Sequence, residues 1–154
     1  MRILIVEDDK TKSARLQSFL KTKYPDEIPQ FERSYQGGLA RVELETFDLI
    51  LMDMSLPTFN ARPSVRLGRP RAFGGYDIMR KMHKKGLVAK IVIVSALEKF
   101  GEGDARMTFE EITEKCEDEF PELYAGAVFF KQSDSRWERR LGNILRRTFE
   151  KAND

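Results

Sequence analysis

The chain has 154 residues, of which 41% are hydrophobic and 34% are charged, and its formal net charge is +2. This length suits one domain with its own core, and so small a net charge gives no argument for nucleic acid as a partner. The single cysteine, Cys116, excludes an intrachain disulfide and favours a reducing, cytoplasmic location. No apolar run is long enough for a signal peptide or a membrane span, so no membrane association is expected.

Two short apolar runs that end in acid are the clearest strands. Residues 3–6 read Ile-Leu-Ile-Val and precede three carboxylates at 7–9, and residues 49–52 read Leu-Ile-Leu-Met and precede Asp53. Continuous apolar runs of this length are typical of parallel strands that are covered on both faces. A carboxylate at the end of such a strand is costly unless its charge is used. The alternative is that Asp53 only caps a loop or the next helix.

The remaining elements alternate between strand and helix. A weak strand is expected over 28–33, with Ile28 and Phe31 as its apolar members, and Pro29 makes it an edge strand or one that starts late. Stronger strands are expected over 90–94, which precedes Ser95, and over 127–130, which precedes Lys131. Helices are expected over residues 11–24, 34–45, 76–85, 108–120 and 135–149.

Apolar spacing and capping signals support these helices. The inward sides are expected to carry these residues: Leu16, Phe19 and Leu20; Leu39 and Val42, with Leu44 as a further candidate; Ile78, Met79 and Met82; Phe109, Ile112, Cys116 and Phe120; Trp137, Leu141, Ile144, Leu145 and Phe149. Thr108 with Glu111, and Ser135 with Glu138, have the spacing of capping boxes. Cys116 is therefore expected to be a small core residue, not a reactive thiol.

Two segments differ in composition from the rest. Residues 58–73 contain four arginines, two prolines and no acid, and they predict a long basic loop, mobile or partly disordered. Residues 98–124 contain ten acidic and three basic residues. One hypothesis pairs this acidic segment with a basic partner or with the arginines at 62–71. The alternative is an ordinary solvated helical face.

The β-α order, repeated five times, predicts an α/β fold: a doubly wound, five-stranded parallel sheet with helices on both faces. The carboxyl ends of parallel strands share one edge, so Glu7, Asp8, Asp53, Ser95 and Lys131 are expected to converge there. Three neighbouring carboxylates need a cation to stay ionised, and Mg²⁺ is a hard ion that carboxylates bind.

A phosphoryl-transfer role follows from the same residue types. Asp53, at the centre of the sheet, can attack phosphorus to give an acyl phosphate. Mg²⁺ and the Lys131 ammonium would supply positive charge to the phosphoryl oxygens, and the Ser95 hydroxyl would donate to another oxygen. Taken singly, a lysine or a serine at a strand end is more simply explained as a solvated end or a turn former.

The motifs at 3–9, 48–57, 91–96 and 129–131 together resemble the receiver domains of the two-component response-regulator family, along nearly the whole chain. The resemblance implies a flavodoxin-like fold and Mg²⁺-dependent phosphorylation of Asp53 by a histidine kinase or phosphotransfer protein. It implies Glu7 and Asp8 as the acidic pair, with Asp8, Asp53 and the backbone carbonyl of Ser55 as direct Mg²⁺ ligands. Ser95 and Lys131 would contact the phosphoryl group. Residues 1–154 would form a single receiver domain with inserts at 58–73 and 98–124.

Two positions depart from the family pattern. Gln132 replaces the proline that usually follows the lysine, and Val128 replaces the aromatic switch residue that often stands three positions before it. These departures put the usual output surface in question. The chain ends at Asp154, about where a receiver ends, so we expect a single-domain regulator or a receiver cut from a longer protein.

Several functions compete on this sequence. The first is a phosphorylation switch that changes the binding of an unidentified downstream protein, with homodimerisation left open; it is not a dedicated enzyme, although it would dephosphorylate itself. The second is a degenerate receiver that binds partners without phosphorylation. A haloacid dehalogenase-type phosphatase would need a second aspartate where Ser55 stands. Nucleic-acid binding would rest on the arginine loop alone and is not expected.

Overall fold

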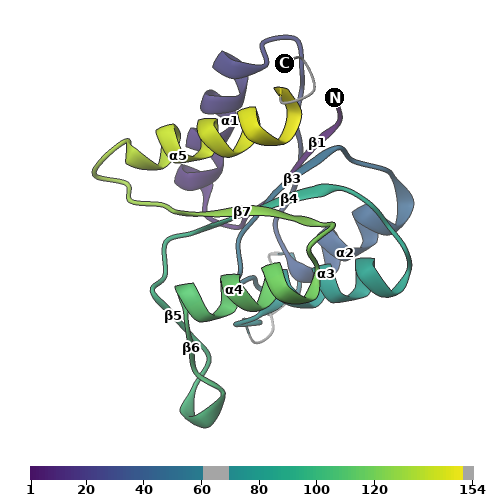
Figure 1. Ribbon diagram of the computed structural model, residues 1–154, viewed down its shortest axis with the longest axis vertical. Coiled ribbons are helices and arrows are strands. Elements are labelled where there is room, and N and C mark those ends of the chain that lie inside the picture. The colour runs from purple at the N-terminus through teal and green to yellow at the C-terminus, as the bar shows by residue number, and fades with distance from the viewer. Residues whose placement is uncertain (61–69, 151–154) are drawn as a thin grey trace.

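A five-stranded parallel sheet forms the centre of the molecule, as the computed structural model shows for residues 1–60 and 70–150 (Figure 1). The strand order is β2-β1-β3-β4-β7, and each neighbouring pair is parallel. The expected fold class is confirmed. The strands are β1 (Ile3–Val6), β2 (Gln30–Glu32), β3 (Leu49–Met52), β4 (Lys90–Ser95) and β7 (Tyr124–Phe129).

Helices cover both faces of this sheet (Figure 1). On one face lie α1 (Lys10–Lys23) and α5 (Arg136–Leu145), and α5 continues into η2 (Arg146–Glu150). On the other face lie α2 (Tyr35–Leu44), α3 (Gly74–Lys84) and α4 (Phe109–Glu119). Among the described residues, no helix combines the length and the apolar composition needed to cross a membrane.

The apolar strands supply two separate cores because side chains alternate between the faces of a sheet. The even-numbered residues of β1 and β3 are buried against α2, α3 and α4, and the odd-numbered residues are buried against α1 and α5. Since both faces are covered, β1 and β3 read as continuous apolar runs. The sequence pattern that predicted parallel strands is thus explained by burial on both sides.

Two apolar residues lie outside the core, contrary to expectation. The strand expected over 28–33 is shortened to β2, and Ile28, with 89% of its surface exposed, precedes it. Leu44, the last residue of α2, is 82% exposed. The edge position predicted for β2 is confirmed. Ile28 precedes the start of β2, and Leu44 lies two residues after the buried Val42, on the opposite side of α2.

Several element boundaries also differ from the predictions. Helix α3 begins two residues earlier than expected, and β7 begins three residues earlier. The capping box of Thr108 and Glu111 is confirmed at the start of α4. Ser135 is the N-cap residue of α5 as expected, but the capping box with Glu138 is wrong, because the Ser135 side chain accepts no capping hydrogen bond and only its carbonyl accepts from the Glu138 amide.

The acidic segment contains a feature that the sequence did not predict. Before α4 the chain forms a small antiparallel hairpin, β5 (Lys99–Phe100) and β6 (Met107–Thr108), with a 3-10 turn η1 (Gly103–Ala105) at its tip. The hairpin projects from the body of the molecule (Figure 1). Phe100 is buried in the core on the α4 side and so anchors the hairpin.

The basic segment is described only at its ends. Its expected mobility and three of its arginines, Arg62, Arg66 and Arg69, lie outside the described residues. Arg71 exchanges two backbone hydrogen bonds with Leu56, its guanidinium lies 3.9 Å from the centre of the Tyr35 ring, and it pairs with Asp77 at 3.3 Å. Arg71 therefore pairs with α3, and not with the acidic segment as hypothesised.

Gly75 in the first turn of α3 provides a test of how closely this helix packs on the loop after β3. A Cβ atom at Gly75 would lie 2.6 Å from the carbonyl oxygen of Asp53. We expect Gly75→Ala to destabilise the fold by about 1–3 kcal/mol, the usual cost of overpacking. Gly142→Ala in α5 is the matched control: its Cβ would meet only Phe19, at 3.8 Å. That variant should gain about 0.5–1 kcal/mol of stability. Denaturant unfolding of both variants measures the difference, and equal signs would contradict the packing argument.

Cys116 provides a test of the core beneath α4. Its side chain is fully buried, and burial raises the pKa of the thiol to about 12. Because the thiolate is the reactive form, we expect the native protein to resist a thiol reagent at pH 8 and to react completely in denaturant. Rapid labelling of the native protein would contradict the burial of this residue.

Candidate functional site

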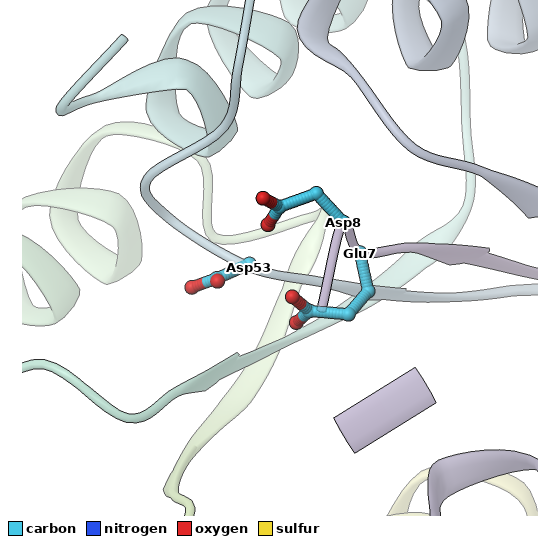
Figure 2. Close-up of side chains that lie close together, drawn as sticks. All are labelled: Glu7, Asp8 and Asp53. Atoms are coloured by element: carbon cyan, nitrogen blue, oxygen red, sulfur yellow. The ribbon is translucent and has the colours of Figure 1, made fainter. Parts of the chain in front are cut away.

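The acidic residues predicted to converge do meet at one edge of the sheet. Strands β1 and β3 pair in register, with Val6 opposite Met52, and the Asp53 amide donates to the Val6 carbonyl at 3.1 Å. The residues that follow the two strands therefore emerge side by side. One carboxylate oxygen of each of Glu7, Asp8 and Asp53 lies within 4.8 Å of the others. Figure 2 shows these side chains gathered at the strand ends.

The three carboxylates differ in exposure and in hydrogen bonding. Glu7 is buried and accepts from the Asp9 amide at 3.1 Å. Asp53 keeps 13% of its side chain exposed and accepts from the Met54 amide at 2.7 Å. Asp8 is exposed. The site therefore has one exposed carboxylate, at Asp8, and two deeper carboxylates that backbone amides hold in place.

Lys12, which the sequence analysis missed, lies inside this cluster. Its Nζ atom is 2.6 Å from Glu7 Oε1 and 3.2 Å from Asp53 Oδ2, and its side chain is only 4% exposed. It stands one helical turn before Leu16 and two before Leu20, on the inward side of α1. A lysine in line with that apolar side and beside three acids was the available signal.

Burial shifts the proton equilibria of the deeper carboxylates. Removal from water raises the pKa of Glu7 from 4.5 to about 7; the negative charge of Asp53 adds to the rise, and Lys12 opposes it. Burial likewise raises the pKa of Asp53, and Lys12 and the Met54 amide oppose that shift. A positive charge in the cluster therefore favours the ionised forms.

The other predicted site residues, Ser95, Ser55 and Lys131, differ in their burial and contacts. Ser95 is fully buried at the end of β4, where its hydroxyl accepts from the Leu97 amide at 3.2 Å. Ser55 is half-buried in the loop after β3. Lys131 follows β7 and is exposed, and it makes no ion pair with the cluster within residues 1–60 and 70–150. The structure therefore brings the carboxylates of Glu7, Asp8 and Asp53 together.

Val128 and Gln132, the two residues that depart from the family pattern, both contact neighbouring elements of the fold. Val128 is fully buried in the core beneath α1 and α5. The carbonyl oxygen of Gln132 accepts from Arg15 at 2.8 Å, which ties the loop after β7 to α1. Phe129, the residue after Val128 in β7, pairs with Ser95 in the sheet register and packs edge-on against Phe109 of α4.

The donor set suits a hard divalent cation. Carboxylate oxygens from three residues meet in a small space, one of them exposed to solvent, and Mg²⁺ typically keeps several waters while binding one or two carboxylates. The raised pKa of Glu7 fits the same reading, because a bound cation would offset the cost of the buried charges.

Comparison with known proteins gives relatives that match along nearly the full length. No protein-family model matches the chain. The uncharacterized protein y4jR of Sinorhizobium fredii is 26% identical over 147 residues, covering 93% of this chain and 95% of the relative. The Detocs response regulatory protein DtcB of Enterobacter cloacae is 27% identical over 143 residues, covering 92% of this chain and 95% of the relative.

Solved structures with a similar fold include receiver domains. A CheY-like response regulator receiver domain protein from Methanospirillum hungatei has a TM-score of 0.60 at 19% identity and covers 99% of this chain and 96% of its own. The receiver domain of a sensor histidine kinase from Pseudomonas aeruginosa, with magnesium coordinated in its active-site cleft, has a TM-score of 0.60 at 19% identity, covering 96% and 95%. CheY6 of R. sphaeroides, in complex with the P1 domain of CheA3, gives a TM-score of 0.60 at 19% identity, covering 97% and 96%.

This chain therefore has the fold of response-regulator receiver domains. The fold class and the resemblance drawn from its motifs are confirmed. The fold and the response-regulator relative are consistent with two-component signalling.

The raised pKa of Glu7 predicts how stability depends on pH without divalent cations. The folded state holds the Glu7 proton more tightly than the unfolded chain, so stability is lost as the pH rises from about 4.5 to about 7. Glu7→Gln removes this titration. We expect the difference in melting temperature, wild type minus variant, to fall by several degrees between pH 5 and pH 8. A difference that stays constant across this range would contradict the raised pKa.

Proposed function

We propose that the protein is a phosphoacceptor receiver in which Asp53 takes a phosphoryl group in a Mg²⁺-dependent reaction. The observation that carries this proposal is the meeting of Glu7, Asp8 and Asp53 within 4.8 Å at the end of the central strands. Asp53 lies at the end of β3, the middle strand of the sheet, and keeps part of its side chain accessible to a phosphodonor.

The metal would be held by the acidic cluster. Asp8 and Asp53 would supply direct carboxylate ligands, the backbone carbonyl of Ser55 a third, and Glu7 the remaining negative charge. When bound, the ion supplies positive charge to the phosphoryl oxygens. The magnesium in the Pseudomonas aeruginosa receiver supports this assignment by analogy.

Backbone and side-chain groups of the protein would orient Asp53 and contact the phosphoryl group. The Met54 amide, 2.7 Å from Asp53 Oδ1, fixes the carboxylate so that its other oxygen can attack phosphorus. Ser95 would donate its hydroxyl to a phosphoryl oxygen, which requires that hydroxyl to turn away from the Leu97 amide. Lys131 would approach from the loop after β7, and its exposure leaves its flexible stem free to do so.

The partner that donates the phosphoryl group would be a histidine kinase or a phosphotransfer protein, located with it in the cytoplasm. The complex of CheY6 with the P1 domain of CheA3 supports this class of partner. Residues 1–154 would act as one receiver domain whose two inserts, at 58–73 and 98–124, alter the surface offered to a downstream protein. Receivers of this fold accept phosphoryl groups and are not dedicated enzymes.

The degenerate receiver is the second candidate. It is favoured by Val128, which is fully buried in the core and is not an aromatic side chain near the surface. Binding of a partner would then not depend on Asp53 chemistry.

Intact mass spectrometry after incubation with acetyl phosphate separates these two functions. We expect one phosphoryl group to be added to the wild type only when Mg²⁺ is present, and none to be added to Asp53→Asn. Asp26→Asn, which changes an exposed aspartate in the turn after α1, is the matched control and should be phosphorylated like the wild type.

A folded wild type that gains no phosphoryl group, either from acetyl phosphate or from a phosphorylated histidine kinase or phosphotransfer protein, would favour the degenerate receiver. A phosphorylated Asp53→Asn variant would place the acceptor elsewhere and would contradict the proposed role of this residue.

A further inference from the structure

Lys12 is held in the acidic cluster by the way α1 begins. Asp9 is the N-cap of α1, and its Oδ1 accepts from the Lys12 amide at 2.8 Å. The helix therefore starts directly after the acidic residues that follow β1, and its first turn lies over the strand ends. Lys12 is on the inward side of that turn, so its side chain runs toward Glu7 and Asp53.

The ammonium of Lys12 is enclosed as well as paired. Its side chain is 4% exposed, and its Nζ lies 6.0 Å from the centre of the Phe130 ring. Its charge is matched by Glu7 at 2.6 Å and by Asp53 at 3.2 Å. Across residues 1–60 and 70–150, no other lysine or arginine pairs with Glu7, Asp8 or Asp53.

Pairing of this kind balances charges that would otherwise be very costly. Three carboxylates in a partly dry space repel one another, and an isolated buried charge is strongly destabilising when its partner is removed. When all three carboxylates are ionised, the single positive charge of Lys12 leaves the cluster with a net charge of about −2. A divalent cation would balance that remaining charge.

The ammonium and a metal ion would, however, compete for Asp53, which contacts Lys12 and would be a direct metal ligand. Mg²⁺ binds oxygen at about 2.0–2.1 Å and demands near-octahedral geometry. Lys12 already contacts one oxygen of Glu7 and one of Asp53, and two cations a few ångströms apart repel strongly where the effective dielectric constant is low. Full use of Asp53 by the metal therefore requires the ammonium to move away from this carboxylate.

We propose that Lys12 is a built-in counter-ion of the cluster: it balances Glu7 and Asp53 when no metal is bound, and it competes with Mg²⁺ for Asp53. Metal binding displaces its ammonium from Asp53. The Mg²⁺ concentration at which the site fills is thus set by a residue outside the ligand set. This inference deepens the proposed function and depends on it for its biological meaning, but it concerns metal affinity and stability, which are measured without phosphorylation.

The test compares Lys12→Met with the wild type. Methionine keeps the length and the apolar stem of lysine but removes the charge. Lys10→Met is the matched control, because it removes the same charge from an exposed lysine two residues earlier on the same helix. Mg²⁺ affinity is measured by calorimetric titration, and the melting temperature is measured over a range of Mg²⁺ concentrations that begins in chelator.

Two changes are expected in Lys12→Met and neither in Lys10→Met. Mg²⁺ should bind about tenfold more tightly, the order expected when one unit charge is removed a few ångströms from the ion in a partly solvated site. In chelator the melting temperature should fall, because three carboxylates are left without a counter-ion, and Mg²⁺ should raise it by more than it raises that of the wild type.

If Lys12→Met does not fold in chelator, the double variant Glu7→Gln with Lys12→Met still tests the inference. It removes one charge of each sign, so it should be more stable in chelator than Lys12→Met alone. Equal Mg²⁺ affinity in the wild type and Lys12→Met would overturn the inference. So would a double variant no more stable than the single one.

The outcomes also separate this inference from the proposed function. A wild type that binds Mg²⁺ and accepts a phosphoryl group, with Lys12→Met showing unchanged affinity, contradicts the counter-ion alone. Tighter Mg²⁺ binding by Lys12→Met, with no phosphorylation of either protein, supports the counter-ion and contradicts the phosphoacceptor.

Discussion

The charge balance of three carboxylates at one sheet edge is the constraint on which the rest of the structure depends. Parallel pairing of β1 with β3 brings Glu7, Asp8 and Asp53 together whether or not their repulsion is offset. Lys12 offsets part of it from within the protein. Because the ion pairs are buried, removal of one charged partner leaves the other as an uncompensated buried charge, which destabilises the fold.

The fold supplies this site through its apolar layers. The continuous apolar runs of β1 and β3 require helices on both faces, and those helices fix where each strand must end. Helix α1 starts at its Asp9 cap directly after the acidic turn, so one short segment of chain provides two carboxylates and the lysine that pairs with one of them. On the other side of the site, α3 packs so closely that Gly75 leaves no room for a side chain beside Asp53.

Much of this arrangement was predictable from sequence, for identifiable reasons. Buried parallel strands leave unbroken apolar runs, and the acids that follow such runs must share an edge, so the sheet and the carboxylate cluster were foreseen. Lys12 was not, because a lysine on a helix is normally solvated, so its place in line with Leu16 and Leu20 indicates burial only weakly. The hairpin of β5 and β6 was missed because two-residue strands leave no periodic pattern. Ser135 had the spacing of a cap, but its side chain does not accept the capping bond.

A crystal structure of the protein grown with Mn²⁺, whose anomalous scattering marks its position, tests the account most directly. Mn²⁺ prefers the same oxygen ligands as Mg²⁺. One anomalous peak is expected among Glu7, Asp8 and Asp53, with Lys12 Nζ moved away from Asp53. An empty cluster at saturating Mn²⁺, with the ammonium still paired to Glu7 and Asp53, would contradict a metal-dependent receiver and would leave Lys12 as a permanent replacement for the metal.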